Sequence, residues 1–293
     1  MEFLRPATWA DALAAKAEHP DALPISGGTD VMVELNFDVK RPPTLLDLTR
    51  IEDLTEWAPH NGWLRIGAGV SYSRLITELG TQLPGLAKAS RTVGSPQIRN
   101  RGTVGGNLGS ASPAGDAHPP LLADDAVVET HSVRGIRRIP ITEFYTGVKR
   151  NALEPDELIA AFLVRPADGP QQFAKIGTRN AMVISVAAFA VSLHPEQQRV
   201  GTGFGSAAPT PRRAPEAERF LNDEMTETGL WDSRAALNPA TVARFGELVA
   251  EAASPIDDVR GTADYRKHAL SVMAKRTLVW AWTDYKKEGR ACA

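Results

Sequence analysis

The order of apolar and polar positions in the N-terminal part of the chain predicts a small α/β unit. Residues 6–18 are expected to form a helix, because Trp9, Leu13 and Ala17 recur at a spacing of four and Thr8 precedes them as an N-cap. Short apolar runs at 22–26, 45–48 and 63–70 are expected to be strands, and helical spacing returns at 72–79. This alternation of strands and helices is typical of an α/β unit.

Further along, the pattern predicts strands first and helices afterwards. Residues 92–116 are rich in glycine and are expected to lack regular structure. Apolar runs predict strands at 126–132, 137–141, 158–164, 173–178, 182–193 and 200–206, and helix-period positions predict helices at 209–221, 241–253 and 264–288. We therefore expect a first domain at 1–177, followed by a C-terminal domain at 178–293 that combines an antiparallel sheet with a helix bundle.

Charge and hydropathy narrow the classes of function. The net charge is −2 and no run of five or six like charges occurs, so a nucleic-acid-binding surface is not indicated. A secretory signal has an apolar stretch between a basic start and a cleavage site, and the N-terminus has no such stretch. The longest nearly apolar run, 182–193, is shorter than the about 20 residues that a membrane-spanning helix needs. A cytoplasmic protein without a membrane span is expected.

The single cysteine, Cys292, limits the redox chemistry of the chain. One cysteine excludes an intrachain disulfide, and it cannot supply the four thiolates that usually hold an iron–sulfur cluster. Any such cluster in the working protein must therefore come from another chain.

Two glycine loops are the main candidate binding sites. The first, Ser26-Gly27-Gly28-Thr29-Asp30, follows a predicted strand, and adjacent glycines allow backbone N–H groups to approach phosphate oxygens closely. The second, 102–109, has four glycines in eight residues, with Thr103 and Asn107 between them. Neither loop contains the lysine of a nucleoside-triphosphate loop, so a pyrophosphate here would be bound mostly by backbone amides. The alternatives are a tight turn for the first loop and a flexible loop for the second.

Other residues near these loops allow both a functional and a structural interpretation. Asp116, fixed in a turn by Pro113 and Gly115, could accept hydrogen bonds from sugar hydroxyls or could cap a helix. A structural or exposed role is favoured for His118, because no partner for a catalytic triad or a metal site is identifiable. Arg99 and Arg101 could contact phosphates or a neighbouring subunit, or could cap the loop. Trp280 and Trp282 are expected to be core and interface residues of the last helix.

The two loops carry a resemblance to a known family. SGGTD at 26–30, QIRNRGTVGGNLGSASPAGD at 97–116 and PPLLA at 119–123 resemble the signature of the FAD-binding subunit of molybdenum hydroxylases. That family includes xanthine dehydrogenase, aerobic carbon monoxide dehydrogenase and hydroxylases of heterocycles. The resemblance covers most of the chain, from the PATWADAL segment to the C-terminal domain.

The resemblance implies a fold and a set of FAD contacts. The fold is the α+β, two-subdomain FAD-binding fold of the vanillyl-alcohol oxidase/p-cresol methylhydroxylase type, with subdomains at about 1–55 and 56–177. The implied FAD contacts are Ile25, Ser26, Gly27, Gly28, Thr29, Asp30 and Val31 in a first pyrophosphate loop; Thr103, Val104, Gly105, Gly106 and Asn107 in a second; Asp116 at ribose or ribityl hydroxyls; and Val93 or Gly94, Leu158 and Lys175 near the flavin. Since the first loop contains no His or Cys, FAD is expected to be non-covalent. No catalytic residue and no metal ligand are expected in this chain.

The implied function is electron transfer in a heteromeric oxidoreductase. A large subunit with a molybdenum cofactor would oxidise the substrate, a small subunit with 2Fe-2S clusters would deliver electrons to FAD, and NAD or another acceptor would receive them. The patterns SGGTDVMVE and ASPAGDAHPPLLA are most similar to purine-oxidising, xanthine dehydrogenase-like members. The alternatives are a medium subunit of a carbon monoxide dehydrogenase or other heterocycle hydroxylase, a stand-alone flavin oxidoreductase of the same superfamily, and a binding module whose glycine loops are structural.

Overall fold

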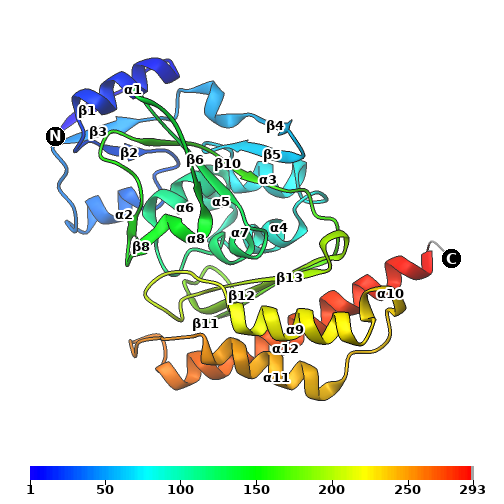
Figure 1. Cartoon of the computed structure of the whole chain (residues 1–293). Coiled ribbons are helices and arrows are strands. Elements are labelled where there is room, and N and C mark those ends of the chain that lie inside the picture. Colours follow the sequence, from blue (N-terminus) through cyan, green and yellow to red (C-terminus); the bar gives the residue numbers. More distant parts are fainter. Residues whose placement is uncertain (292–293) are drawn as a thin grey trace.

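The structure is a computed structural model that describes residues 1–291, so Cys292 lies outside the described part. The chain forms two subdomains in its N-terminal half, and a C-terminal sheet covered by helices lies below them in Figure 1. Within residues 1–291, no helix is both long enough and apolar enough to span a membrane.

The first subdomain is a three-stranded parallel sheet. The strand order is β1-β3-β2, and the connecting helices allow the parallel pairing. Its elements are β1 (Glu2–Leu4), α1 (Trp9–Glu18), β2 (Leu23–Ile25), α2 (Val31–Asn36) and β3 (Thr44–Asp47). Thr8 is the N-cap of α1 and accepts a hydrogen bond from the Asp11 amide, as its sequence position predicts. The first glycine loop connects β2 to α2.

The second subdomain contains a five-stranded antiparallel sheet in the order β4-β5-β10-β6-β7. Its strands are β4 (Trp57–His60), β5 (Trp63–Gly67), β6 (Val127–Ser132), β7 (Gly135–Pro140) and β10 (Leu158–Val164). The 3-10 helix η1 (Glu52–Thr55) precedes β4. A separate two-stranded sheet is formed by β8 (Tyr145–Gly147) and β9 (Arg150–Asn151). Its helices are α3 (Tyr72–Glu78), α4 (Pro84–Arg91), α5 (Pro96–Arg101), α6 (Val104–Ser110), α7 (His118–Ala123) and α8 (Ile141–Phe144). The central strand β10 is buried along its whole length, which explains its uninterrupted apolar sequence.

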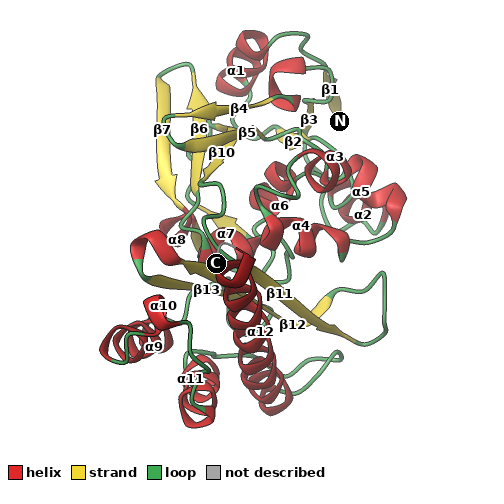
Figure 2. Ribbon diagram, turned by 90° about the vertical axis from the view of Figure 1, so that its right-hand side faces the viewer, coloured by secondary structure: helices red, strands yellow, loops and turns green. Residues whose placement is uncertain are grey.

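The C-terminal domain is an antiparallel sheet in the order β11-β12-β13, with helices on one face. Its elements are β11 (Gln171–Gly177), β12 (Ser185–His194), η2 (Pro195–Gln197), β13 (Arg199–Gly205), α9 (Pro215–Glu227), α10 (Leu230–Ser233), α11 (Pro239–Glu251) and α12 (Ala263–Ala291). The long helix α12 runs along the sheet, as Figure 2 shows, and α9 and α11 complete the layer. Trp282 is buried in the core of this domain, whereas Trp280 is 48% exposed.

The expected fold class is confirmed, but the expectation that residues 92–116 lack regular structure is wrong. The stretch 92–116 is not structure-poor, because α5 and α6 lie within it. Ser95 and Thr103 cap these helices, and Pro96 occupies the first turn of α5. Glycine lowers helix propensity, but the helix α6 is packed against the strand β10, with Leu108 fully buried, and this tertiary packing offsets the low propensity.

The strand β11 joins the two halves of the chain. It pairs with β12, so the sheet of the C-terminal domain begins at Gln171, before the expected boundary at 177/178. On its other side, the Gly85 amide donates to the Gln171 side chain, and the Lys88 ammonium donates to the Gln171 carbonyl at 2.7 Å. This strand therefore carries its side chains, Lys175 among them, to the joint between the two domains.

Candidate functional site

A cavity of about 420 Å³ lies where the two glycine loops meet. Such a volume is within the range of about 300–1,000 Å³ that is usual for small-molecule and cofactor sites. The walls come from the first loop, from η1 and α3, from α6, from β10 and from β11. We call it the first cavity.

Most of the expected FAD contacts line the first cavity. They are Ser26, Gly27, Gly28, Thr29, Asp30, Val31, Val93, Gly94, Thr103, Gly105, Gly106, Asn107, Asp116, Leu158 and Lys175. Two others do not. Ile25 ends β2 and its side chain lies under Gly28, and Val104 points into the core with 1% exposure. The expected contacts of Ile25 and Val104 therefore involve at most their backbone.

Glycine is required where the two loops touch. A Cβ on Gly27 would lie 2.5 Å from the carbonyl carbon of Arg101 and 2.9 Å from the amide nitrogen of Gly102, so no side chain fits there. This close backbone approach places the first loop directly against the segment that leads into α6. Gly28 has a φ of +74°, in the left-handed region that glycine adopts without strain.

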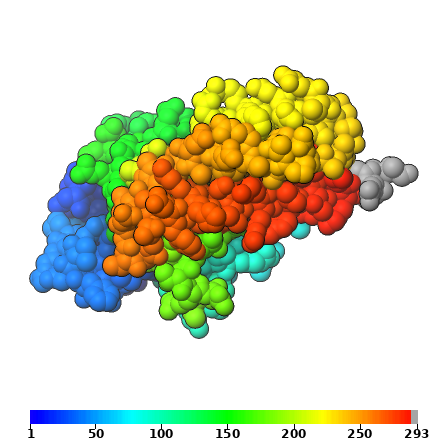
Figure 3. Space-filling view, turned by 90° about the horizontal axis from the view of Figure 1, so that it is seen from below, coloured from blue at the N-terminus to red at the C-terminus, as the bar shows by residue number. Residues whose placement is uncertain are grey.

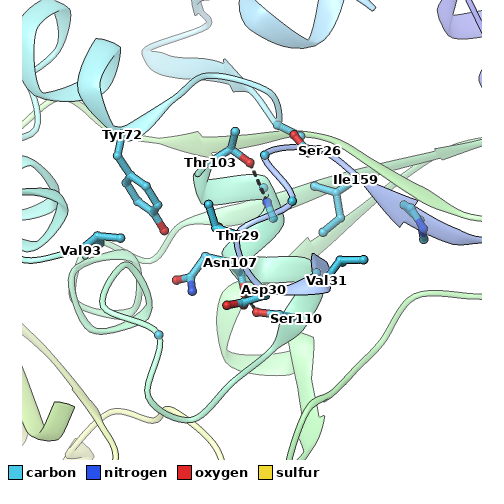
Figure 4. Close-up of a pocket in the computed structure, with 18 of the residues that line it drawn as sticks. Ser26, Thr29, Asp30, Val31, Tyr72, Val93, Thr103, Asn107, Ser110 and Ile159 are labelled. Carbon is cyan, nitrogen blue, oxygen red and sulfur yellow. Dashed lines mark hydrogen bonds between the residues drawn. The ribbon is translucent and has the colours of Figure 1, made fainter. Parts of the chain in front are cut away.

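The second loop is the start of helix α6. The Thr103 hydroxyl accepts a hydrogen bond from the Gly106 amide at 2.9 Å, shown as a dashed line in Figure 4. The first amides of a helix have no intrahelical partner and point toward an anion at its N-terminus. A Cβ on Gly106 would meet only Thr103 Oγ1 within 4 Å, so the face of this glycine is open. The geometry therefore leaves space and donors for a phosphate.

Asp116 presents an unsatisfied acceptor at the first cavity. Its Oδ2 accepts from the Lys175 ammonium at 2.5 Å and from the Thr92 hydroxyl at 3.2 Å, while its buried Oδ1 has no partner among the described residues. Burial raises the pKa of the Asp116 carboxyl, and the charge of Lys175 opposes this rise. A buried carboxylate oxygen without a donor costs free energy, which a ligand hydroxyl would recover.

Tyr72 is a lining residue that the sequence did not indicate. It begins α3, its side chain is 3% exposed, and burial raises the pKa of its phenol well above the ordinary value. In Figure 4 its hydroxyl points toward the same open space as Val93 and Asn107. A neutral phenol in this position can donate a hydrogen bond to a ligand.

His118 has a structural environment. Its side chain is fully buried, and its Nδ1 lies 2.7 Å from the Tyr145 hydroxyl. Burial lowers the pKa of His118 to about 3, so the imidazole is neutral at ordinary pH. Arg99 donates to the carbonyls of Val93 and Gly94 at 3.0 Å each and thereby caps that turn, one of the two roles considered for it.

These features fit FAD. The first cavity has an open glycine face at Gly106 and helix-start amides at one side, an unsatisfied carboxylate oxygen at Asp116, and apolar walls that include Val93 and Ile159. Among the described residues, no group of three or more His, Cys, Asp or Glu side chains lies close enough to bind a metal ion.

Comparison with known proteins identifies the family. Residues 1–165 match a family described as "FAD binding domain in molybdopterin dehydrogenase", and residues 172–281 match the "CO dehydrogenase flavoprotein C-terminal domain". A putative xanthine dehydrogenase FAD-binding subunit of Escherichia coli (strain K12) is 33% identical over 94% of each chain. Nicotine 6-hydroxylase medium subunit of Paenarthrobacter nicotinovorans is 30% identical over 96% of this chain and 97% of the relative.

A solved structure agrees with these sequence matches. Carbon monoxide dehydrogenase from Hydrogenophaga pseudoflava superimposes with a TM-score of 0.88 and 26% identity, over 97% of this chain and 98% of that chain. The family matches, the share of each chain that is covered and the shared fold thus agree. The chain belongs to the family of FAD-binding medium subunits of molybdenum hydroxylases.

Proposed function

We propose that this chain binds FAD non-covalently in the first cavity and relays electrons from iron–sulfur clusters of a partner subunit to NAD, within a complex that oxidises a purine. The observation that supports FAD binding most directly is the unsatisfied Oδ1 of Asp116 in a cavity that two glycine loops border. Bound FAD would supply the redox chemistry, because it exchanges one electron at a time with iron–sulfur clusters and two with a nicotinamide.

The side chains and amides of this chain would bind and orient the cofactor. The amides of the first loop and of the start of α6 would bind the pyrophosphate, whose two negative charges need donors but no lysine. Asp116 would accept from a ribose or ribityl hydroxyl, and Lys175 would hold that carboxylate in its charged form. Val93, Gly94 and Leu158 would contact the flavin ring and exclude water from it.

Non-covalent binding follows from the residues around the first cavity. Covalent flavin attachment commonly uses a His or Cys side chain, and neither residue type occurs among those that line this cavity. We therefore expect FAD to be released intact by denaturation of the chain.

The substrate and the acceptor are the finer parts of the proposal. The relatives act, by their names, on xanthine, nicotine and carbon monoxide, so membership in the family leaves the substrate open. A purine is favoured by the similarity to the Escherichia coli subunit, which extends over 94% of both chains. We also propose that the complex works in the cytoplasm with NAD as its acceptor.

Purification of the chain from its native source with its partners tests the proposal. We expect a flavin absorbance spectrum, molybdenum and iron in the same complex, and reduction of NAD by hypoxanthine or xanthine. An active enzyme without partner chains, molybdenum and iron would refute the relay and favour a stand-alone flavin oxidoreductase. A folded chain that contains no flavin and takes up none would refute FAD binding. Activity with nicotine or another heterocycle, and none with purines, would refute only the substrate assignment.

A further inference from the structure

Two tyrosines of the second subdomain differ in what their hydroxyls contact. The hydroxyl of Tyr145, at the start of β8, lies 2.7 Å from Nδ1 of His118 and thus has a protein partner. Tyr72 is 3% exposed and lines the first cavity, but its hydroxyl has no hydrogen-bond partner among the described residues. The Tyr72 hydroxyl is therefore a buried polar group that only a ligand in the first cavity can satisfy.

The position of Tyr72 is fixed by the segment that leads into α6. The Tyr72 amide donates to the Gly102 carbonyl at 3.0 Å, and a Cβ on Gly102 would lie 3.3 Å from Cδ2 of the Tyr72 ring. A buried hydroxyl without a partner is unfavourable, because it has lost its hydrogen bonds to water and gained none. A bound ligand with an acceptor at this point would remove that cost.

The Tyr72 phenol acts as a donor. Burial raises its pKa well above the ordinary value, and the negative charges of Asp116 and Asp30 raise it further, so the phenol keeps its proton at neutral pH. In Figure 4 the hydroxyl points toward the same open space as Val93 and Asn107. Val93 is an expected contact of the flavin ring, so the donor faces the part of the first cavity that we assign to the flavin.

The two lysines that line the first cavity are already paired. Lys175 contacts Asp116 at 2.5 Å, and Lys40 contacts Glu34 at 2.8 Å. Reduction of a flavin by two electrons and one proton leaves one negative charge on the ring. A fixed O–H dipole such as that of Tyr72 stabilises such a charge strongly where water is excluded, and hydrogen bonds to the ring tune its redox properties.

We propose that Tyr72 donates a hydrogen bond to the flavin ring of bound FAD, and that it raises the reduction potential of the flavin because this bond is stronger to the reduced ring. The inference rests on the proposed function. In the reaction that it serves, two electrons from the iron–sulfur clusters and one proton from water convert the oxidised flavin to its anionic reduced form. A higher flavin potential favours this transfer.

The reduction potential of the flavin in Tyr72→Phe tests the proposal. It is measured by anaerobic redox titration of the flavin absorbance in the FAD-loaded complex, with the deflavinated complex as the baseline for the iron–sulfur bands. We expect the preference of the protein for reduced over oxidised FAD to fall about tenfold. That ratio corresponds to a potential lower by about 30 mV for a two-electron couple.

Two other tyrosines provide matched controls. Tyr145→Phe removes a hydroxyl that has a protein partner and lies outside the first cavity, so the unfolding midpoint should fall while the flavin potential stays about unchanged. Tyr265→Phe should change neither quantity, because Tyr265 is 47% exposed in α12, one of the C-terminal helices on the face that Figure 3 shows. Deflavinated Tyr72→Phe should be at least as stable as wild type, since it loses a hydroxyl without a partner.

The outcomes separate this inference from the proposed function. An unchanged flavin potential in Tyr72→Phe would overturn the inference, and so would an equal fall in Tyr145→Phe. Weaker FAD binding at an unchanged potential would assign the hydroxyl to the ribityl chain or a phosphate and overturn its assignment to the ring. A lower unfolding midpoint of deflavinated Tyr72→Phe would show that the hydroxyl has a structural partner instead. Absence of FAD from the wild-type complex would refute the proposed function itself.

Discussion

Replacing Gly27 by alanine tests the contact between the two glycine loops. The new Cβ would lie 2.5 Å from the carbonyl carbon of Arg101, whereas ordinary contacts of a Cβ begin at 3.4 Å. Because the Cβ would overlap the Arg101 carbonyl oxygen even more closely, the first loop and the segment before α6 must separate by more than about 0.9 Å. A hydrogen bond of about 2.9 Å from a loop amide to a phosphate would lengthen beyond about 3.6 Å, where it is no longer a hydrogen bond.

The expected loss of FAD affinity follows from the number of hydrogen bonds to the phosphate that break. Hydrogen bonds to charged groups contribute about 1.5–3 kcal/mol each, so losing two weakens FAD binding by about 3–6 kcal/mol. That corresponds to a Kd about a hundredfold to ten-thousandfold higher. The measurement is the flavin content of the purified protein, followed by titration of the apo form with FAD.

Two further variants make the result interpretable. Gly147→Ala is the matched control, since a Cβ there meets nothing closer than 3.7 Å and Gly147 lies outside the first cavity, so FAD content should be unchanged. Gly106→Val adds a side chain on an open face, so the chain should fold and lose FAD even if Gly27→Ala misfolds. Retention of FAD with about wild-type affinity in both Gly27→Ala and Gly106→Val would refute the two-loop site.

Three other changes give independent tests. Asp116→Asn should weaken FAD binding by about tenfold, because a neutral acceptor replaces a charged one, and unchanged affinity in a titration would contradict the role of Asp116. The pKa of His118 is lowered from 6.5 to about 3, so the folded state binds fewer protons and stability is lost as the pH falls from 6.5 toward 3. In His118→Gln the free energy of unfolding should fall less steeply with falling pH, and the slope should be smaller than that of wild type by about 1.4 kcal/mol per pH unit. Urea unfolding curves that give the same pH slope as wild type would show that His118 does not titrate in this way. Arg266→Met should destabilise the chain by about 3 kcal/mol, because Arg266 donates to two buried carbonyls at 2.7 Å, and a thermal unfolding midpoint equal to that of wild type would show the contact to be unimportant.

The sequence predicted strands well where burial is complete and poorly where glycine is frequent. The bounds of β10 were predicted to the residue, because an apolar run flanked by polar residues leaves no other assignment. The helices α5 and α6 were missed, since four glycines outweighed the helix signals in the composition of the segment. The cap residues Ser95 and Thr103 were nevertheless readable, and Ser95-Pro96 is a common start of a helix.

The candidate site was likewise predictable only in part. Glycine loops are local in sequence, so the first cavity was predictable from them and from the family resemblance. The role of Tyr72 depends on how α3 is oriented, and no local motif marks it. Arg91, Arg99 and Arg179 come from α4, α5 and the loop after β11, so only the folded chain brings them together.

The ion pair between Lys175 and Asp116 joins a strand of the C-terminal sheet to the loop that precedes α7. A ligand that contacts this pair and binds only the folded chain stabilises it, by about 2.7 kcal/mol at a concentration of a hundred times its Kd. That stabilisation reaches α9, α11 and α12, although no residue of these helices lines the first cavity. Cofactor binding would thus stabilise the C-terminal helices as well, so loss of FAD should lower the stability of the whole chain.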